Sequence, residues 1–148
     1  MDRVALFPGT FDPFTKGHES IVKRALLLFD RIIIGVGYNS SKDSGFFPVD
    51  KRVEDIAILF KDFSSVSVEK YDCLTVDMCR KAKVGFIIRG IRNVVDFEYE
   101  RSIALTNKVL EPDVETVFFF ADQDLSAINS NILRDILRHD GDISKFLP

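Results

Sequence analysis

Short apolar runs alternate with longer amphipathic segments along the whole chain, and this alternation constrains the fold most strongly. The runs are only a few residues long, which is typical of strands buried in a sheet. We expect strands over residues 4–7, 31–38, 65–70, 85–88 and 114–121. Apolar residues at helical spacing follow each strand. We expect helices over residues 17–29, 48–60, 74–82, 94–110 and 130–138.

Five β–α units in succession predict a parallel sheet with helices on both faces. Because crossovers between parallel strands are right-handed, the units form a doubly wound, Rossmann-like α/β sheet of five strands. The length of 148 residues predicts a single domain over residues 1–148. Ligands bind such folds at the carboxyl ends of the strands. We therefore expect the site in the loops at 8–17, 38–48, 71–74, 89–93 and 121–130.

The composition excludes several classes of protein. With 20 Lys and Arg against 23 Asp and Glu, the formal net charge is −3, which argues against a nucleic-acid binder. The chain is 46% hydrophobic, too apolar for a disordered protein. No segment approaches the ~20 apolar residues that cross a bilayer, and we expect no membrane association. Cys73 and Cys79 form no disulfide framework, and we expect a cytoplasmic protein.

The turn after the first expected strand contains residues suited to binding an anion. It reads GTFDPFTKGH over residues 9–18. A turn shaped by Gly and Pro at a helix start brings backbone N–H groups close to a ligand, and the helix dipole favours negative charge. His18 would lie in the first helical turn, facing the phosphates. Taken alone, the same residues also fit an ordinary strand–helix turn with His18 on the surface.

Two arginines, Arg89 and Arg92, lie where the fourth expected strand meets the long helix. The planar fork of donors in each guanidinium suits phosphate, so the pair can hold two phosphate groups. The alternative is that both arginines form ion pairs with Asp96, Glu98 or Glu100. We interpret Asp96 and Glu98 as structural residues that orient the arginines or contact a neighbouring subunit. Residues 129–131, Asn-Ser-Asn, are a strong helix N-cap signal, which capping alone would explain.

Residues 9–18 resemble the T/H-x-G-H signature of the nucleotidyltransferase superfamily. Residues 88–100, IRGIRNVVDFEYE, closely match the I-R-G-x-R-x-x-x-D-F-E-Y-E string of the bacterial phosphopantetheine adenylyltransferases, and the resemblance extends over essentially the whole chain. It implies that ATP and 4′-phosphopantetheine react to give dephospho-coenzyme A and pyrophosphate by direct in-line displacement. It also implies Mg²⁺ carried by ATP and water, a homohexamer and feedback binding of coenzyme A.

The resemblance implies roles for individual residues. The catalytic residues it implies are Thr10, His18, Lys42 and Arg89. The ATP-binding residues it implies are Thr10, Phe11, His18, Gly90, Ile91, Arg92, Glu100, Leu125, Ser126, Ala127, Ile128, Asn129, Ser130 and Asn131. The contacts to 4′-phosphopantetheine it implies are Thr10, Lys42, Leu74, Thr75, Arg89 and Asn107. No protein-bound metal site is expected.

The chain departs from the family pattern in two of these segments. The usual I-S-S-[ST] is Ile-Asn-Ser-Asn at 128–131, where Asn can still cap a helix and donate from its amide. The usual S-K-K-P is Ser-Lys-Asp-Ser at 41–44, which places the negative charge of Asp43 beside the expected site. Two other functions stay open: a sister nucleotidyltransferase with another phosphorylated acceptor, and a non-catalytic nucleotide sensor on the same fold.

Overall fold

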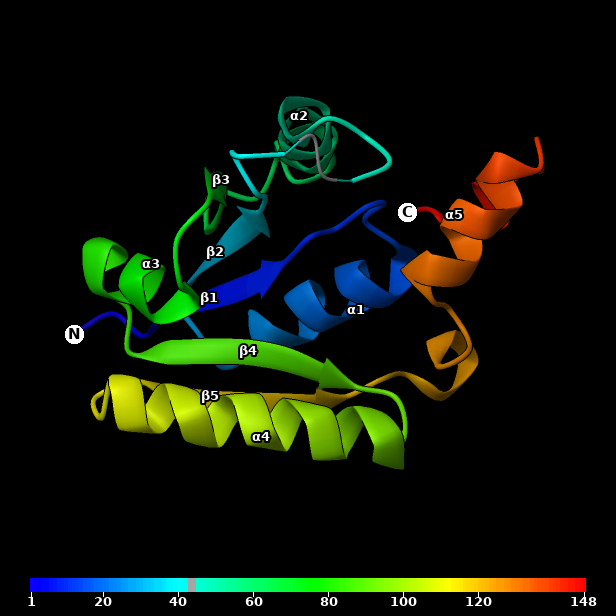
Figure 1. Cartoon of the computed structure of the whole chain (residues 1–148). Coiled ribbons are helices and arrows are strands. Elements are labelled where there is room, and N and C mark those ends of the chain that lie inside the picture. Colours follow the sequence, from blue (N-terminus) through cyan, green and yellow to red (C-terminus); the bar gives the residue numbers. More distant parts are fainter. Residues whose placement is uncertain (43–44) are drawn as a thin grey trace.

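The computed structural model describes residues 1–42 and 45–148, so the expected charge of Asp43 lies outside the described residues (Figure 1). The elements in chain order are β1 (Val4–Gly9), α1 (Lys16–Ala25), β2 (Arg31–Gly37), α2 (Val49–Leu59), β3 (Val66–Tyr71), α3 (Thr75–Ala82), β4 (Phe86–Ile91), α4 (Val94–Leu110), β5 (Glu115–Phe120) and α5 (Ser130–Arg138). All five expected strands and all five expected helices are therefore confirmed. None of the described helices is both long enough and apolar enough to cross a membrane.

The first helix is shorter than the sequence predicts. It ends at Ala25, whereas the apolar spacing extends to Phe29. The chain leaves the helix through a turn that exposes 82% of Leu27, and Phe29 then returns to the core with its N–H donating to the carbonyl of Ala25 at 2.9 Å. Phe29 thus belongs to the core but not to the helix. Its position four residues after Ala25 fits helical spacing because both side chains are buried on the same side.

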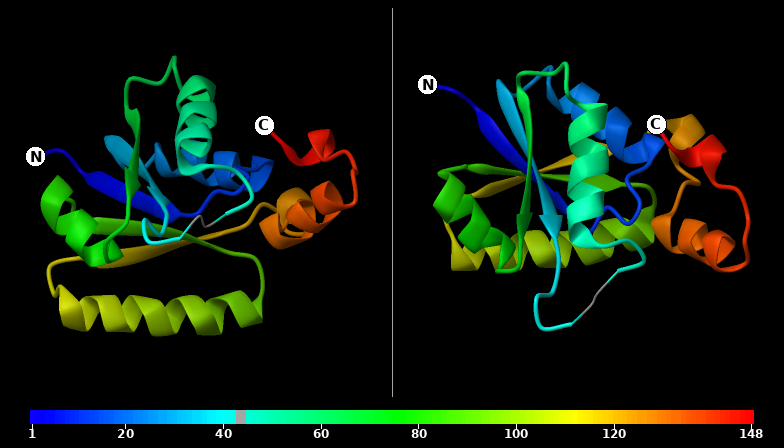
Figure 2. Two further views of the ribbon diagram at one scale, coloured as in Figure 1. Left: turned by 45° about the horizontal axis from the view of Figure 1, so that its top comes forward. Right: turned by 90° about the horizontal axis from the view of Figure 1, so that it is seen from above.

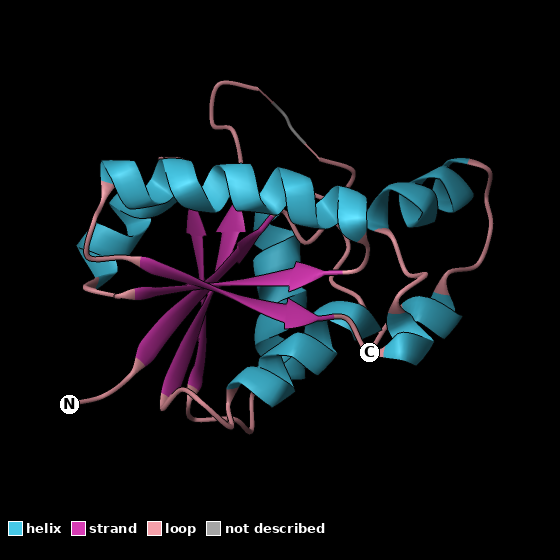
Figure 3. Cartoon of the chain, turned by 90° about the horizontal axis from the view of Figure 1, so that it is seen from below, coloured by secondary structure: helices cyan, strands magenta, loops and turns pink. Residues whose placement is uncertain are grey.

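The sheet is parallel throughout, with the strand order β3-β2-β1-β4-β5. The first three strands form one half of the sheet, with β1 innermost and β3 at the edge. The chain then crosses over to β4, which lies next to β1, and β5 forms the other edge. Helices cover both faces of this sheet (Figure 3), which confirms the doubly wound fold. The order reverses between β1 and β4, and their carboxyl ends form the point where such sheets bind ligands.

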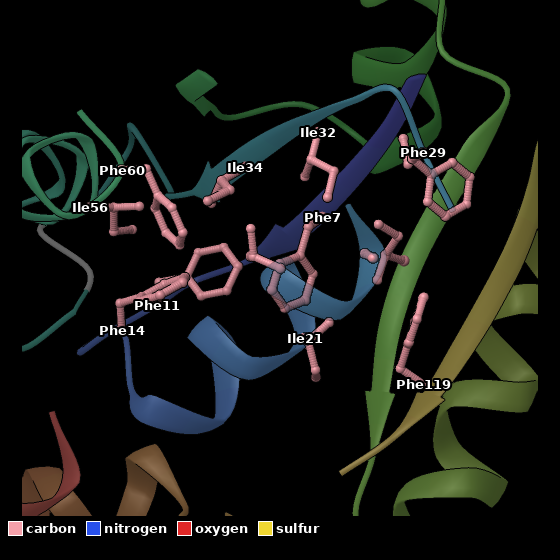
Figure 4. Close-up of a cluster of buried hydrophobic side chains, with 14 of the residues drawn as sticks. Phe7, Phe11, Phe14, Ile21, Phe29, Ile32, Ile34, Ile56, Phe60 and Phe119 are labelled. Carbon is pink, nitrogen blue, oxygen red and sulfur yellow. The ribbon is translucent and has the colours of Figure 1, made fainter. Parts of the chain in front are cut away.

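Alternate residues of β1 supply the two faces of the core. Ala5 and Phe7 join a cluster with α1 and α2, whereas Leu6 faces Met78 and Cys79 of α3 on the opposite side. The first cluster continues into the turn after β1 as a group of phenylalanines (Figure 4). The rings of Phe11 and Phe14 lie 5.2 Å apart between centroids, and Phe7 packs edge-on against Phe11 at 5.1 Å. The turn after β1 is therefore packed against the core through its phenylalanine side chains.

The last helix, α5, lies beyond the carboxyl ends of the strands and next to the start of α1 (Figures 1 and 2). Leu133 fixes it to the body of the protein, with 1% of its surface exposed. Asn129 caps the helix by accepting a hydrogen bond from the N–H of Asn131 at 2.8 Å. The helix start is thus held at the edge of the sheet where the order of the strands reverses.

The C-cap of α3 offers a test of the fold. Lys83 adopts a left-handed conformation there (φ 56°, ψ 47°), which costs a side-chain-bearing residue about 1–2 kcal/mol. Because glycine avoids this cost but loses more chain entropy, Lys83→Gly should raise the free energy of unfolding by about 0.5–1 kcal/mol. Urea unfolding measures the change. Lys81→Gly, inside the same helix, is the control and should lower stability by ~1 kcal/mol; destabilisation by both variants would contradict the prediction.

Candidate functional site

A cavity of about 480 Å³ opens at the carboxyl ends of β1 and β4, and we call it the central cavity. It is lined by the turn after β1, the start of α1, the end of β4, the start of α4 and the start of α5. Two further cavities adjoin it. The side cavity, of about 320 Å³, reaches toward α3 and shares Thr10 and Arg89 with the central cavity. The α2 cavity, of about 800 Å³, shares Thr10 and Arg134.

Most residues of the predicted ATP site line the central cavity. These are Thr10, Phe11, His18, Gly90, Arg92, Glu100, Leu125, Ile128, Asn129, Ser130 and Asn131. Three others do not: Ile91 is buried in β4, and Ser126 and Ala127 are exposed outside the lining. The turn after β1 and the segment before α5, more than a hundred residues apart along the chain, thus meet in one place.

The predicted contacts to 4′-phosphopantetheine divide into two groups. Thr10, Thr75, Arg89 and Asn107 line the side cavity, where the hydroxyls of Tyr71 and Thr75 are hydrogen-bonded at 3.1 Å. Leu74 and Lys42 lie outside the lining of all three cavities. Leu74 is 60% exposed as the N-cap of α3. Lys42 is exposed, and its N–H donates to the carbonyl of Asn39 at 3.3 Å.

His18 is a neutral hydrogen-bond donor at the floor of the central cavity. The N–H of Thr15 donates to its Nδ1 at 3.0 Å, so the proton of the neutral ring is on Nε2. Burial, together with the charges of Arg89 and Arg92, lowers the pKa of His18 from 6.5 to about 3. The ring packs edge-on against Phe11 with the centroids 5.0 Å apart. His18 therefore presents an N–H group without a positive charge.

Arg89 reaches from the end of β4 across to α4. Its Nε and Nη2 donate to the two oxygens of Glu100 at 2.8 and 2.6 Å, and its Nη1 donates to the carbonyl of Pro8. Glu100 is only 7% exposed. The acidic partner that the sequence left open is thus Glu100, whose two oxygens are both occupied by Arg89. The immediate function of Glu100 is to orient the arginine.

Arg92, between β4 and α4, likewise forms an ion pair with an acidic residue of α4. Its Nε donates to Asp96 at 3.0 Å, and its Nη1 donates to the carbonyl of Ile128 at 2.9 Å. The interpretation of Asp96 as a residue that orients an arginine is confirmed. Asn93 caps α4 by accepting from the N–H of Asp96 at 2.9 Å. Arg92 therefore joins the start of α4 to the segment that precedes α5.

Arg134 also lines the central cavity, and the sequence analysis missed it. Its Nη1 donates to the carbonyl of Asp12 at 2.8 Å, and its Nη2 donates to the side-chain oxygen of Asn131. Both acceptors are neutral, and no carboxylate forms an ion pair with Arg134 within the described residues. The available signal was its spacing, because position 134 lies one helical turn after Ser130, on the same face of α5.

The start of α5 is bound directly to the turn after β1. The Ser130 hydroxyl donates to the carbonyl of Pro13 at 3.2 Å, beside the bond from Arg134 to Asp12.

No group of three His, Cys, Asp or Glu side chains that could hold a metal ion lies within residues 1–42 and 45–148. The carboxylates that line the central cavity, Asp96 and Glu100, are ion-paired with arginines.

Comparisons with known proteins agree with this geometry. The family model described as cytidylyltransferase-like matches residues 6–136. A phosphopantetheine adenylyltransferase of Bacteroides fragilis is 48% identical over 99% of this chain and 96% of its own length. The enzyme of the same name from Phocaeicola vulgatus is 50% identical over 99% of this chain and 95% of its own. The one from Cytophaga hutchinsonii is 46% identical over 100% and 98%.

A solved structure shares the fold. A bifunctional NMN adenylyltransferase/ADP ribose pyrophosphatase from Francisella tularensis superposes with a TM-score of 0.77 at 18% sequence identity. The superposition covers 99% of this chain and 45% of that chain, so this chain spans less than half of the bifunctional protein. The likeness confirms the doubly wound α/β fold.

The neutral state of His18 predicts a pH-dependent stability. The folded pKa of about 3 lies below the ordinary 6.5, so below pH 6.5 the unfolded chain binds a proton that the folded chain does not. Stability from this group is therefore full above the unfolded pKa and is lost as the pH falls toward the folded pKa. As the pH falls through this range, the free energy of unfolding of the wild type should decrease relative to that of His18→Gln by at most ~1.4 kcal/mol per pH unit.

Urea unfolding at a series of pH values tests this prediction. The exposed His139, with 78% of its side chain accessible, provides the matched control. His139→Gln should leave the pH dependence of unfolding as it is in the wild type. Parallel curves for the wild type and His18→Gln would show that His18 is not held neutral by the fold.

Proposed function

The chain belongs to the cytidylyltransferase-like family and, within it, to the phosphopantetheine adenylyltransferases, and from this we propose that it transfers AMP from ATP to 4′-phosphopantetheine. The products are dephospho-coenzyme A and pyrophosphate. The observation that carries the proposal is the meeting of His18, Arg92 and the start of α5 in one cavity. This cavity adjoins a second one, lined by Thr75 and Asn107, on the other side of Thr10.

The reaction is a direct displacement at phosphorus. A phosphate oxygen of 4′-phosphopantetheine attacks the α-phosphorus of ATP, the bond between the α-phosphorus and the bridging oxygen breaks, and pyrophosphate leaves. Because the attacking oxygen is already ionised, the step needs no strong general base. The protein contributes by placing the two substrates in line and by stabilising the charge that spreads over the oxygens.

The two cavities divide the substrates between them. We place the triphosphate in the central cavity, against Arg92, Arg134 and the N-terminus of α5, where the helix dipole favours an anion. The pantetheine arm occupies the side cavity. Thr10 lines both cavities and holds the attacking phosphate where they join, with Arg89 beside it. The resemblance supports Lys42 as a further ligand of that phosphate.

His18 stabilises the α-phosphate as its charge increases. The Nε2–H group donates a hydrogen bond, and the ring keeps its proton because Nδ1 already accepts one from Thr15. Mg²⁺ enters as part of the substrate, bound to the oxygens of ATP and to water. This fits a lining in which the acidic groups Asp96 and Glu100 are already engaged by arginines.

The resemblance to the family also suggests where the protein acts, how it assembles and what regulates it. We propose a cytoplasmic homohexamer that binds coenzyme A as a feedback ligand. The exposed apolar residues of α4 support an assembly, because Val94, Val95 and Val109 are between 75% and 81% exposed. Apolar surface of this kind is covered by another chain in many oligomers.

Pyrophosphate release tests the proposed reaction. The protein is incubated with ATP and Mg²⁺, in parallel with 4′-phosphopantetheine, with nicotinamide mononucleotide or with buffer alone. We expect release only with 4′-phosphopantetheine, and mass spectrometry should detect dephospho-coenzyme A. Release with nicotinamide mononucleotide would assign another acceptor. Binding of ATP without release in any arm would identify a nucleotide sensor.

Arg134 provides a test of where the triphosphate binds. Arg134→Met removes a charged donor and should raise KM for ATP by about 10–100-fold, the range of one or two hydrogen bonds to a charged group. KM for 4′-phosphopantetheine should stay close to that of the wild type, because Arg134 does not line the side cavity. Arg101→Met, exposed on α4, is the control. Steady-state kinetics with each substrate varied in turn give both constants, and an unchanged KM for ATP would remove Arg134 from the site.

A further inference from the structure

Arg52 of α2 is buried, with 4% of its surface exposed, although it lies outside the lining of the central cavity. Its guanidinium donates to the carbonyls of Thr10 at 2.7 Å, Phe47 at 3.0 Å and Gly37 at 3.2 Å. These carbonyls belong to the turn after β1, the segment before α2 and the end of β2. One side chain therefore joins three segments at the carboxyl edge of the sheet.

Asp12, in the turn after β1, places a negative charge near Arg52. Its carboxylate is 3% exposed and accepts from the N–H groups of Phe46 at 2.6 Å and Phe47 at 2.9 Å. Burial lowers the pKa of Arg52, and the charge of Asp12 opposes this shift. Buried charges persist only when they are compensated and hydrogen-bonded. Here the two groups carry opposite charges, and each of them is hydrogen-bonded to backbone.

Gly45 shows how closely the neighbouring backbone packs on these two groups. A Cβ atom at this position would lie 3.1 Å from Oδ2 of Asp12 and 3.2 Å from Nη2 of Arg52. The φ of Gly45 is +107°, a value that side-chain-bearing residues rarely adopt. The backbone before α2 therefore lies directly on the two charged groups, with no side chain between them.

The backbone that Arg52 holds most closely is that of Thr10, whose side chain lines all three cavities. The next residue, Phe11, has a φ of 48°, which is costly for a residue other than glycine. Arg134 holds the carbonyl of Asp12 on the other side of Phe11. Arginines from two helices thus bind the backbone carbonyls on either side of Phe11.

We propose that Arg52, with the opposite charge of Asp12 nearby, is a positioning residue for the reaction: it fixes the backbone of Thr10 together with both ends of the segment between β2 and α2. The inference rests on the proposed function, in which Thr10 and Lys42 hold the attacking phosphate. Lys42 lies along the chain between Gly37 and Phe47, whose carbonyls Arg52 binds. The ATP contacts depend less on Arg52 and the Asp12 carboxylate, because Arg92 is held by Asp96 and the carbonyl of Ile128, and Arg134 by Asn131 and the carbonyl of Asp12.

Two variants test the positioning role. Arg52→Lys keeps the charge, but an ammonium group lacks the planar fork that serves three carbonyls. Asp12→Asn keeps the shape, but its amide has one acceptor oxygen for the two N–H groups. We expect kcat to fall by about 10–100-fold, since misplacing a reacting group by an ångström costs on the order of a hundredfold. KM for 4′-phosphopantetheine should rise by a larger factor than Kd for ATP, which is measured calorimetrically.

Lys51→Ala is the matched control for both variants. Lys51 is the neighbour of Arg52 on α2 and forms an exposed ion pair with Asp55, so its loss should leave kcat, KM and Kd as in the wild type. Thermal unfolding of each variant shows whether it is folded at the assay temperature. Wild-type kcat in a folded Arg52→Lys or Asp12→Asn protein would overturn the proposal, and so would equal weakening of ATP and 4′-phosphopantetheine binding.

Hydrogen–deuterium exchange examines the same variants without turnover. We expect the amides of Phe46 and Phe47 and the segment 9–12 to lose protection, with β4 and α5 unchanged. This readout also separates the two proposals. If the wild type does not use 4′-phosphopantetheine, the proposed function fails, and hydrogen–deuterium exchange then tests the positioning role of Arg52 by itself. Local loss of protection would then support the positioning role, and an unchanged pattern would overturn it.

Discussion

The site depends on how the backbone at the end of β1 and in the turn before α1 satisfies its carbonyl groups. Leaving one buried carbonyl unpaired costs ~1–3 kcal/mol, and side chains from other elements supply the missing donors. The donors are Arg89 for Pro8, Arg52 for Thr10, Arg134 for Asp12 and Ser130 for Pro13. They come from β4, α2 and α5. The hydrogen bonds that stabilise the turn therefore also gather the elements that line the central cavity.

The arginines at this edge differ in how their charge is balanced. Arg89 is ion-paired with Glu100, whereas Arg134 contacts only neutral acceptors in the described structure. A guanidinium has five N–H donors. Three of those on Arg89 and two of those on Arg134 are used within the protein, so both retain donors for a ligand. Because internal partners already orient both side chains, binding an anion orders less of the protein, which favours affinity.

Much of the fold could be predicted because its signals are local. The apolar spacing of each strand and helix depends on near neighbours, as does the pairing of Arg92 with Asp96, four residues later in the sequence. Contacts set by packing could not be predicted. Glu100 meets Arg89 only because α4 lies back along β4 and β5, and Arg52 reaches Thr10 across 42 positions of sequence. A motif match likewise does not determine the conformation of the loop that carries Lys42, which lies outside the lining of the three cavities in this structure.

The two asparagines that depart from the family pattern fit the same logic. The side-chain oxygen of Asn129 accepts the N–H of Asn131, and the side-chain oxygen of Asn131 accepts from Arg134. With each amide oxygen occupied by a donor, each amide nitrogen keeps its N–H groups as donors. Both residues line the central cavity. A serine offers one hydroxyl proton where asparagine offers two amide protons, so these departures leave the start of α5 rich in donors for an anion.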